Sequence, residues 1–205
     1  SFGSAARLFG PEILSIAPTP DLTWFAYPAA RALFAAQRSD AALQWLGLAR
    51  AQGLTDQAAA ATAMALAPLA RLSRQDEQPL AALLAGWRKT RAALPAADIG
   101  QRRDVVLLCL LAAQGERVPS EEWLGLLDNQ NGAGGLSRPV LSQLLRLATE
   151  EARLGETVAF ALAGFGDLSK ADPILLYQGL VGLRRLGLEA DARAIAIEAA
   201  LANGI

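Results

Sequence analysis

The chain has 205 residues, of which 53% are hydrophobic, and its 19 basic and 20 acidic side chains give a formal net charge of −1. This near-neutral balance excludes the strong positive field that draws proteins onto nucleic acid. Ala and Leu supply much of the hydrophobic fraction, and both are strong helix formers. No run of apolar residues approaches the roughly 18 needed to cross a membrane. We therefore expect a single all-α domain over residues 1–205, with no membrane span and no nucleic-acid partner.

Several kinds of chemistry are excluded by the residues that the chain lacks. It has no His, and Cys109 is its only cysteine, so imidazole-dependent nucleophiles and thiolate zinc centres cannot be built. Cys109 lies in an apolar run, where a free thiol behaves as a small hydrophobic side chain. The acidic pairs 76–77, 121–122 and 150–151 are adjacent on helices, where neighbours diverge by about 100° instead of converging on a substrate. The sequence thus predicts no catalytic, cofactor or metal site.

Residues 1–27 are interpreted as an N-terminal segment with a Pro-rich linker at Pro18–Pro20. The following residues carry recurrent helix punctuation, with Ser, Asp or Pro at helix starts and Gly after helix ends. We expect helices over 28–37 and 39–53, and an Ala-rich helix from Asp56 that Pro68 kinks or ends.

The next third of the chain is predicted to be helical without a visible repeat. A helix that starts at Pro79 carries an apolar stripe at 3–4 residue spacing that includes Trp87. Within the segment 99–113, the run from Val105 to Leu111 is apolar on all sides, which indicates a buried central helix. A strand is the competing interpretation, but the polar turns from Ile99 to Asp104 continue into a longer helix. A short helix over 123–127 and a loop over 128–135 follow. Together these elements form an irregular helical half over 28–127.

Residues 136–205 are predicted to form two helical hairpins. Pro139 and Pro173 each lie in the first turn of a helix, 34 residues apart, and each helix is followed by a glycine, Gly155 or Gly187, and then by another helix. Gly53 marks a third turn of this kind. Repeated hairpins of this period are typical of helical solenoids. The fold class expected is all-α, with stacked antiparallel helical hairpins in an α-solenoid or an irregular helical array.

These turns resemble those of the broad tetratricopeptide-like group of helical-hairpin repeats, in which a small residue at the turn lets two helices pack closely. The resemblance covers about three hairpins. It implies an α-solenoid that offers a surface to a peptide or a partner protein and has no enzymatic activity of its own.

Two groups of residues are candidates for binding a partner. Trp24, Phe25 and Tyr27 form the densest aromatic group; they are core if the N-terminal segment packs back on the first hairpin, and an exposed anchor if it does not. A second, basic group lies near the end of the Trp87 helix and suits either a solvated helix end or an acidic partner. It consists of Arg88, Lys89 and Arg91.

The functional expectation is a protein-protein interaction or scaffold module that is not an enzyme and binds another protein, a peptide or a second copy of itself. The alternative is a structural helical domain attached to a catalytic domain elsewhere in a longer parent chain, for example a bacterial cell-envelope enzyme. The preference for Arg over Lys and the Ala-rich composition suggest a bacterial source. The sequence does not distinguish a cytoplasmic from a periplasmic location.

Overall fold

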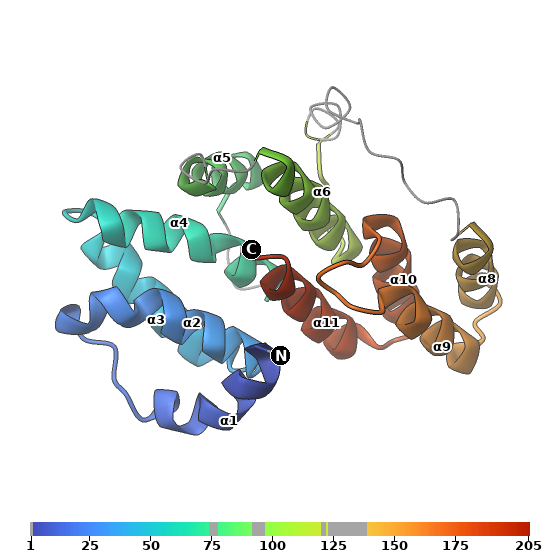
Figure 1. Cartoon of the computed structure of the whole chain (residues 1–205), viewed down its shortest axis with the longest axis horizontal. Coiled ribbons are helices and arrows are strands. Elements are labelled where there is room, and N and C mark those ends of the chain that lie inside the picture. The colour runs from blue at the N-terminus through green and yellow to red at the C-terminus, as the bar shows by residue number, and fades with distance from the viewer. Residues whose placement is uncertain (1, 74–77, 92–96, 120–121, 123–138) are drawn as a thin grey trace. The chain divides into compact units, whose positions relative to one another are not determined.

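The computed structural model describes residues 2–73, 78–91, 97–119, 122 and 139–205. Most residues in these ranges are helical and none is in a strand, which confirms the all-α prediction (Figure 1). The helices group into two compact units. Unit 1 comprises Ser1–Ala96 with Gly204–Ile205, and unit 2 comprises Ala97–Asn203.

Unit 1 is a succession of α-helices in which each α-helix packs on the next α-helix. Its elements are α1 (Phe2–Leu14), the 3-10 helix η1 (Pro20–Phe25), α2 (Ala26–Ala35), α3 (Ser39–Gln52), α4 (Gln57–Leu72) and α5 (Leu80–Arg91). The helix α2 packs on α4 as well, and η1 packs on both α2 and α3. Large side chains that are fully buried include Phe34, Trp45, Leu46, Leu66 and Leu69. The apolar stripe predicted around Trp87 is buried at Leu83, Leu84 and Trp87.

The helix α1 was not expected from the sequence, which was interpreted there as a segment leading to a linker. Pro11 lies inside α1 and removes one backbone hydrogen bond from it. The helix is held against α2 by a face of small residues: Ala6 and Gly10 are buried. A Cβ at Gly10 would lie 3.4 Å from the Cβ of Ala36. Packing between small residues therefore stabilises a helix that its own proline weakens.

Helix starts and ends follow the predicted punctuation in several places. The carboxylates of Asp56 and Asp172 accept hydrogen bonds of 2.8 Å from the backbone N–H groups of Ala58 and Ile174, and so cap α4 and α10. Pro68 does not end α4, which continues to Leu72. The predicted elements over 123–127 and 128–135 lie outside the described residues.

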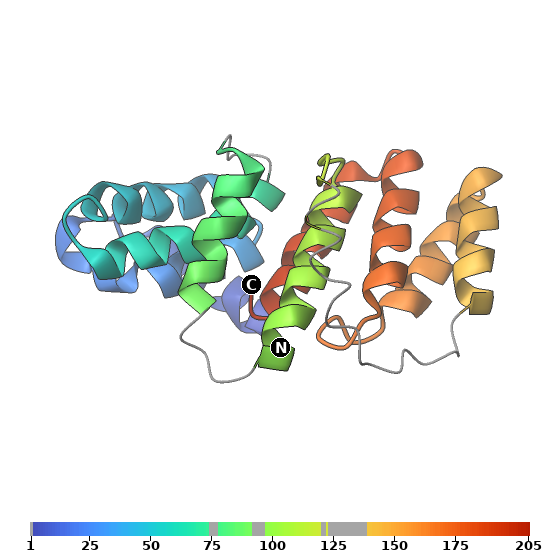
Figure 2. The same cartoon turned by 90° about the horizontal axis from the view of Figure 1, so that it is seen from above.

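Unit 2 is organised around α10 (Pro173–Arg185). The other elements are α6 (Ala97–Ala113), α8 (Pro139–Glu150), α9 (Leu154–Phe165) and α11 (Glu189–Ala202). All four pack on α10, which stands between α6 and α11 on one side and α8 and α9 on the other (Figure 2). The segment 99–113 was predicted to be the central helix, but α10 has that position. The apolar run of α6 is nevertheless buried from Val106 to Leu111.

The division between the units differs from the halves predicted from the sequence. It falls between Ala96 and Ala97, so that α6 groups with the C-terminal helices. The predicted halves, 28–127 and 136–205, instead joined this helix to the N-terminal ones. The reason is that α6 packs on α10 and α11, which are distant in sequence.

The helix pairs α2–α3, α8–α9 and α10–α11 are joined by the same tight turn. In each, one residue has a positive φ: Gln37 (60°), Ala152 (54°) and Gly187 (83°). The next residue donates its N–H to a carbonyl five residues earlier, as in Arg38 to Leu33 (2.8 Å), Arg153 to Ala148 (2.8 Å) and Leu188 to Leu183 (2.9 Å). This is the hydrogen-bond pattern of the Schellman motif. Gly115 (90°) ends α6 in the same way, with Glu116 donating to Leu111 (3.0 Å).

The structure confirms Gly53 and Gly187 as turn glycines and corrects Gly155. Gly187 occupies the left-handed position as predicted. Gly155 does not: it lies in the first turn of α9, and Ala152 occupies the position instead. Gly53 ends α3, as predicted, and has an ordinary φ of −63°. It is small for another reason, because a Cβ there would lie 2.9 Å from the Cα of Ala60 on α4.

Candidate protein-binding surface

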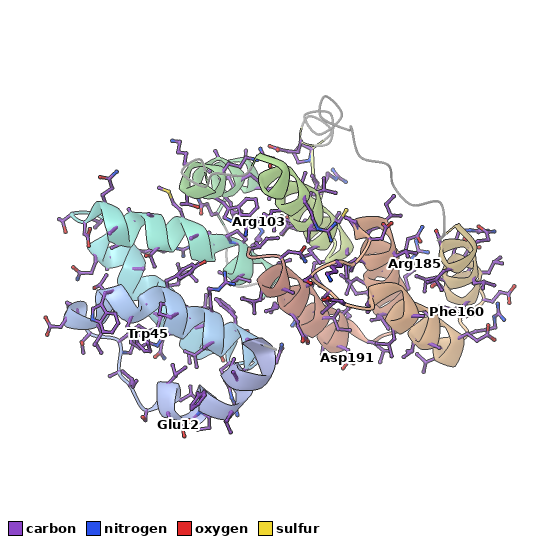
Figure 3. All side chains as sticks on the ribbon, viewed as in Figure 1. Glu12, Trp45, Arg103, Phe160, Arg185 and Asp191 are labelled. Atoms are coloured by element: carbon purple, nitrogen blue, oxygen red, sulfur yellow. The ribbon has the colours of Figure 1, made fainter. Side chains whose placement is uncertain are left out.

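The side of α1 that faces away from α2 is apolar and exposed. With about 100° between successive residues, Leu8 lies opposite the buried face of Ala6 and Gly10, and Phe9 lies on the flank of that outer side. Leu8 is 70% exposed and Phe9 is 56% exposed. Glu12 falls between them around the helix axis and is also exposed, on the side of α1 away from α2 (Figure 3).

The 3-10 helix η1 presents another large apolar side chain, Trp24, which packs against the neighbouring Phe25. The ring centroid of Phe25 lies 5.5 Å from that of Trp24 and 5.6 Å from that of Trp45, with which Phe25 forms a T-shaped pair. Trp45 is buried in the core of unit 1, with 2% of its surface exposed, whereas Trp24 is 75% exposed. The hydroxyl of Thr23 donates to the carbonyl of Pro20 at 2.6 Å and closes the turn. Phe25 thus anchors the turn, and Trp24 projects from it.

Tyr27 has partners within its own unit. Its hydroxyl accepts a hydrogen bond of 3.0 Å from Nη1 of Arg31, and the guanidinium carbon of Arg31 lies 5.3 Å from the centre of the Tyr27 ring. The same Nη1 donates to the carbonyl of Ile205 at 2.9 Å. These interactions hold the Tyr27 ring on α2, so it is less suited than Trp24 to entering a pocket on a partner.

The sequence left open whether the aromatic group is core or an exposed anchor. In the structure its three residues differ in how far they are buried. Phe25 is half-buried against Trp45, whereas Tyr27 and Trp24 are exposed, Trp24 far more than Tyr27. A role of these three residues in binding a partner stays a prediction.

We use the name N-terminal apolar surface for exposed apolar side chains on two elements, α1 with the residues after it and η1, each of which packs on α2. They are Leu8, Phe9, Leu14, Ile16 and Trp24. Within residues 8–30 the charged side chains are acidic, although Arg7 directly precedes Leu8 in α1. No Lys or Arg occurs from Leu8 to Ala30, whereas Glu12 and Asp21 are both exposed. Neither carboxylate forms an ion pair with any residue that the structure describes.

The predicted basic group lies on a different element, the C-terminal half of α5. Lys89 is exposed and Arg88 is half-buried. Arg91 is the last residue of α5, and its side chain lies outside the described part. The helix α5 packs on α4, whereas η1 packs on α2 and α3. The basic and the aromatic residues therefore lie on separate elements. A role of the three basic residues of α5 in binding a partner stays a prediction, separate from that of the aromatic residues.

The apolar residues of α1 were missed as binding candidates because the helix itself was missed. A signal for them was present. Ala6, Gly10 and Ile13 recur at 3–4 residue spacing, which is the period of a helix face, and Leu8 and Phe9 fall outside that face. The pattern was not recognised because Pro11 lies within it, and proline disfavours the interior of a helix.

Unit 1 also has an open hollow between α3 and α4, with a volume of about 230 Å³. Its lining is mostly aliphatic and contains no carboxylate, hydroxyl or thiol. The lining residues are Arg50, Gly53, Leu54, Ala60, Ala63, Met64, Ala67 and Gln78. This set can accept an apolar side chain but offers no group for acid-base or nucleophilic chemistry.

The described residues contain neither a metal-binding cluster nor a membrane-spanning helix. Among them, no cluster of three or more His, Cys, Asp or Glu side chains is arranged to hold a metal ion. No helix in the same ranges is long and apolar enough to cross a membrane. Cys109 is buried, and burial, with a smaller effect of the nearby Asp172 charge, raises the pKa of its thiol to about 11. This thiol is therefore protonated and a poor nucleophile at neutral pH.

Comparison of the chain with protein-family models, with curated proteins and with solved structures gives no match.

Proposed function

We propose that this chain is a protein-interaction module without catalytic activity, and that it binds its partner through the N-terminal apolar surface. The observation that carries the proposal is the 75% exposure of Trp24 on a turn that Phe25 anchors to the core. A large aromatic side chain held outward by a rigid support is the kind of residue that dominates binding energy at protein interfaces.

The free energy available from covering this surface supports the proposal. Removing a Leu or Phe side chain from water contributes about 1.5–3 kcal/mol. Leu8, Phe9 and Trp24 are each more than half exposed, so a partner that covers them gains several such contributions. Because Ala6 and Gly10 already hold α1 on α2, little of this gain is lost in ordering the helix.

The positions of these side chains also support an interface in preference to a small-molecule site. Leu8 and Phe9 lie on the outer side of a helix, and Trp24 projects from a turn. None of them lines the hollow between α3 and α4. Small-molecule sites are concave and enclose most of their ligand, whereas protein partners cover convex or flat surfaces.

The test is affinity capture from the native lysate, with quantification of every protein retained. The variants are Trp24→Ala and the double variant Leu8→Ser/Phe9→Ser. The matched control is Leu162→Ser, which removes an exposed leucine of unit 2. Thermal unfolding of each variant establishes first that the fold is kept.

We expect one or more proteins to be retained by the wild type and by the Leu162→Ser control, and to be reduced at least tenfold by both surface variants, as for the loss of an interface hot spot of about 2 kcal/mol. Equal retention by the wild type and both surface variants contradicts the proposal. Loss in the Leu162→Ser control to the same extent also contradicts it, because the effect then does not belong to this surface.

A further inference from the structure

We infer that the partner of Trp24 is a second copy of this chain, and that the indole of one copy enters the hollow between α3 and α4 of the other. The inference rests on the proposed function and names the partner. It combines two observations on unit 1. Trp24 is 75% exposed on a turn that Phe25 supports, and an apolar hollow elsewhere on the same unit suits one aromatic side chain.

The size of the hollow suits one large side chain. Its volume is about 230 Å³, whereas sites that enclose a drug-sized ligand measure about 300–1,000 Å³. Three small residues of α4 leave this space open, namely Ala60, Ala63 and Ala67. Leu54 also lines the hollow and is 88% exposed, so its side chain is available to a partner. A ring that enters the hollow therefore meets mainly aliphatic carbon.

Two further lining residues favour an aromatic ring over an aliphatic side chain. Met64 is exposed, and a thioether sulfur makes favourable contacts with aromatic rings at a distance of about 5 Å. Arg50 is exposed as well, and a guanidinium is attracted to the face of an aromatic ring, most strongly to that of Trp. The hollow thus combines aliphatic, thioether and cationic groups, all of which an indole accepts.

The charges beside the two halves of this contact are opposite. Asp21, three residues before Trp24, is exposed and is the only charged residue of η1. Arg50 is the only charged residue that lines the hollow in the described part of the chain. Asp56, at the start of α4, accepts the hydrogen bond from the backbone N–H of Ala58. Contact between two copies therefore brings an acidic side chain toward a basic one.

A second copy is the occupant because the chain carries both halves of the contact. Within one copy, Trp24 packs on Phe25 and does not line the hollow, so the two halves meet only between copies. A contact through two different surfaces closes into a pair if it is reciprocal, and otherwise continues from copy to copy. The formal net charge of −1 opposes neither arrangement, because chains close to neutral do not repel one another.

The experiment uses the purified full chain and sedimentation equilibrium over a range of concentrations, which gives the dissociation constant of self-association. Trp24→Ala removes the indole, and the hollow variant Arg50→Glu/Leu54→Glu changes two exposed residues that line the hollow. The matched control is Arg185→Glu/Ile174→Glu, which makes the same changes at two exposed residues of α10. Thermal unfolding of each variant establishes first that the fold is kept.

We expect the wild type and the α10 control to associate with dissociation constants within about threefold of each other. Trp24→Ala and the hollow variant should each associate at least about tenfold more weakly. An equimolar mixture of these two variants should associate at least about tenfold more strongly than either alone, because the indole of the hollow variant enters the intact hollow of Trp24→Ala. Recovery in a mixture of two variants that fail alone is the specific signature of this contact.

Three results would overturn the inference. If the purified wild type sediments as a single copy at every concentration while capture from the lysate still depends on Trp24, the partner is another protein, and only the proposed function survives. If Trp24→Ala weakens self-association and the hollow variant does not, the indole meets another surface of the second copy. If the mixture associates no better than its two components, or the α10 control weakens association as much as the hollow variant does, the indole and the hollow do not meet.

Discussion

At the scale of single residues, the left-handed positions that end α2, α6, α8 and α10 show where the backbone stores strain. Gly115 and Gly187 adopt a positive φ without a steric penalty, but Gln37 and Ala152 adopt the same conformation with a side chain. A side chain in this region costs roughly 1–2 kcal/mol per residue. The turns at Gln37 and Ala152 are therefore imposed by the packing of the helices that they join.

The two glycines near helix starts in unit 2 should respond oppositely to alanine. Gly187→Ala puts a Cβ on a backbone with φ of 83° and should lower the free energy of unfolding by about 1 kcal/mol. Gly155→Ala lies within α9, where nothing is within 4 Å of the added Cβ, and should raise the free energy of unfolding by about 0.5 kcal/mol. Urea denaturation measures both changes. If Gly155→Ala destabilises by as much as Gly187→Ala, then Gly155 is the turn residue that the sequence suggested.

The buried thiol of Cys109 predicts a dependence of stability on alkaline pH. Its pKa is about 11 in the folded chain, against 9.0 for an unperturbed thiol. The unfolded chain therefore loses this proton at lower pH than the folded chain does, and the free energy of unfolding should fall as the pH rises from about 9 to about 11. Comparing urea denaturation of the wild type and Cys109→Ala across this range isolates the effect of the thiol. The same slope in both proteins would rule the thiol out as its cause.

At the scale of elements, the central position of α10 depends on glycines that let neighbouring helices approach. A Cβ at Gly179 would lie 2.5 Å from Cε1 of Phe165 on α9, and a Cβ at Gly182 would lie 2.7 Å from Oγ1 of Thr149 on α8. Side chains at these two positions would separate α10 from α8 and α9. The glycines therefore fix the distance between the three helices.

The Gly179→Ala substitution tests this close approach. In an open helix the change to alanine stabilises by roughly 0.5–1 kcal/mol. At Gly179, however, the clash with the Phe165 ring should give a net destabilisation of about 1–3 kcal/mol. Gly47→Ala is the matched control, because nothing lies within 4 Å of an added Cβ at this position of α3. The midpoints of urea denaturation should therefore move in opposite directions, and a stabilised Gly179→Ala variant would mean that α9 and α10 are farther apart than described.

At the scale of the whole molecule, the chain forms two compact units, and its last two residues belong to the first of them. Ile205 is only 1% exposed, and its carbonyl accepts the hydrogen bond from Arg31 on α2. A residue at one end of the chain thus contributes to the core that residues 1–96 form.

The Ile205→Ser substitution shows whether the two units unfold separately. Removing this buried side chain should destabilise unit 1 by about 2–4 kcal/mol. Native-state hydrogen exchange should then show weaker protection of amides in α2 and α3, with unchanged protection in α10. Ile174→Ser, which changes a side chain that is 63% exposed, is the control and should alter neither unit. Equal loss of protection in both units would mean that residues 1–205 unfold as the single domain expected from the sequence.

The sequence by itself determined the all-α class and the position of most helices. It did so because helix propensity, capping by Asp56 and Asp172, and the 3–4 spacing around Trp87 are local properties. It also identified Trp24 as a candidate anchor, but it could not decide between core and surface. Trp24 is exposed because the buried Trp45, 21 residues later in the chain, packs against Phe25 and not against Trp24.

Only the tertiary structure decided the remaining features. The helix α1 persists around Pro11 because Ala6 and Gly10 pack on α2, and this packing turns Leu8 and Phe9 outward. The turn before α9 falls on Ala152 instead of Gly155 because packed helices outweigh the backbone preference of one residue. The helix α6 joins the C-terminal unit because its apolar run meets α10. Each of these features arises from contacts between segments that are separate in sequence, which no local pattern can contain.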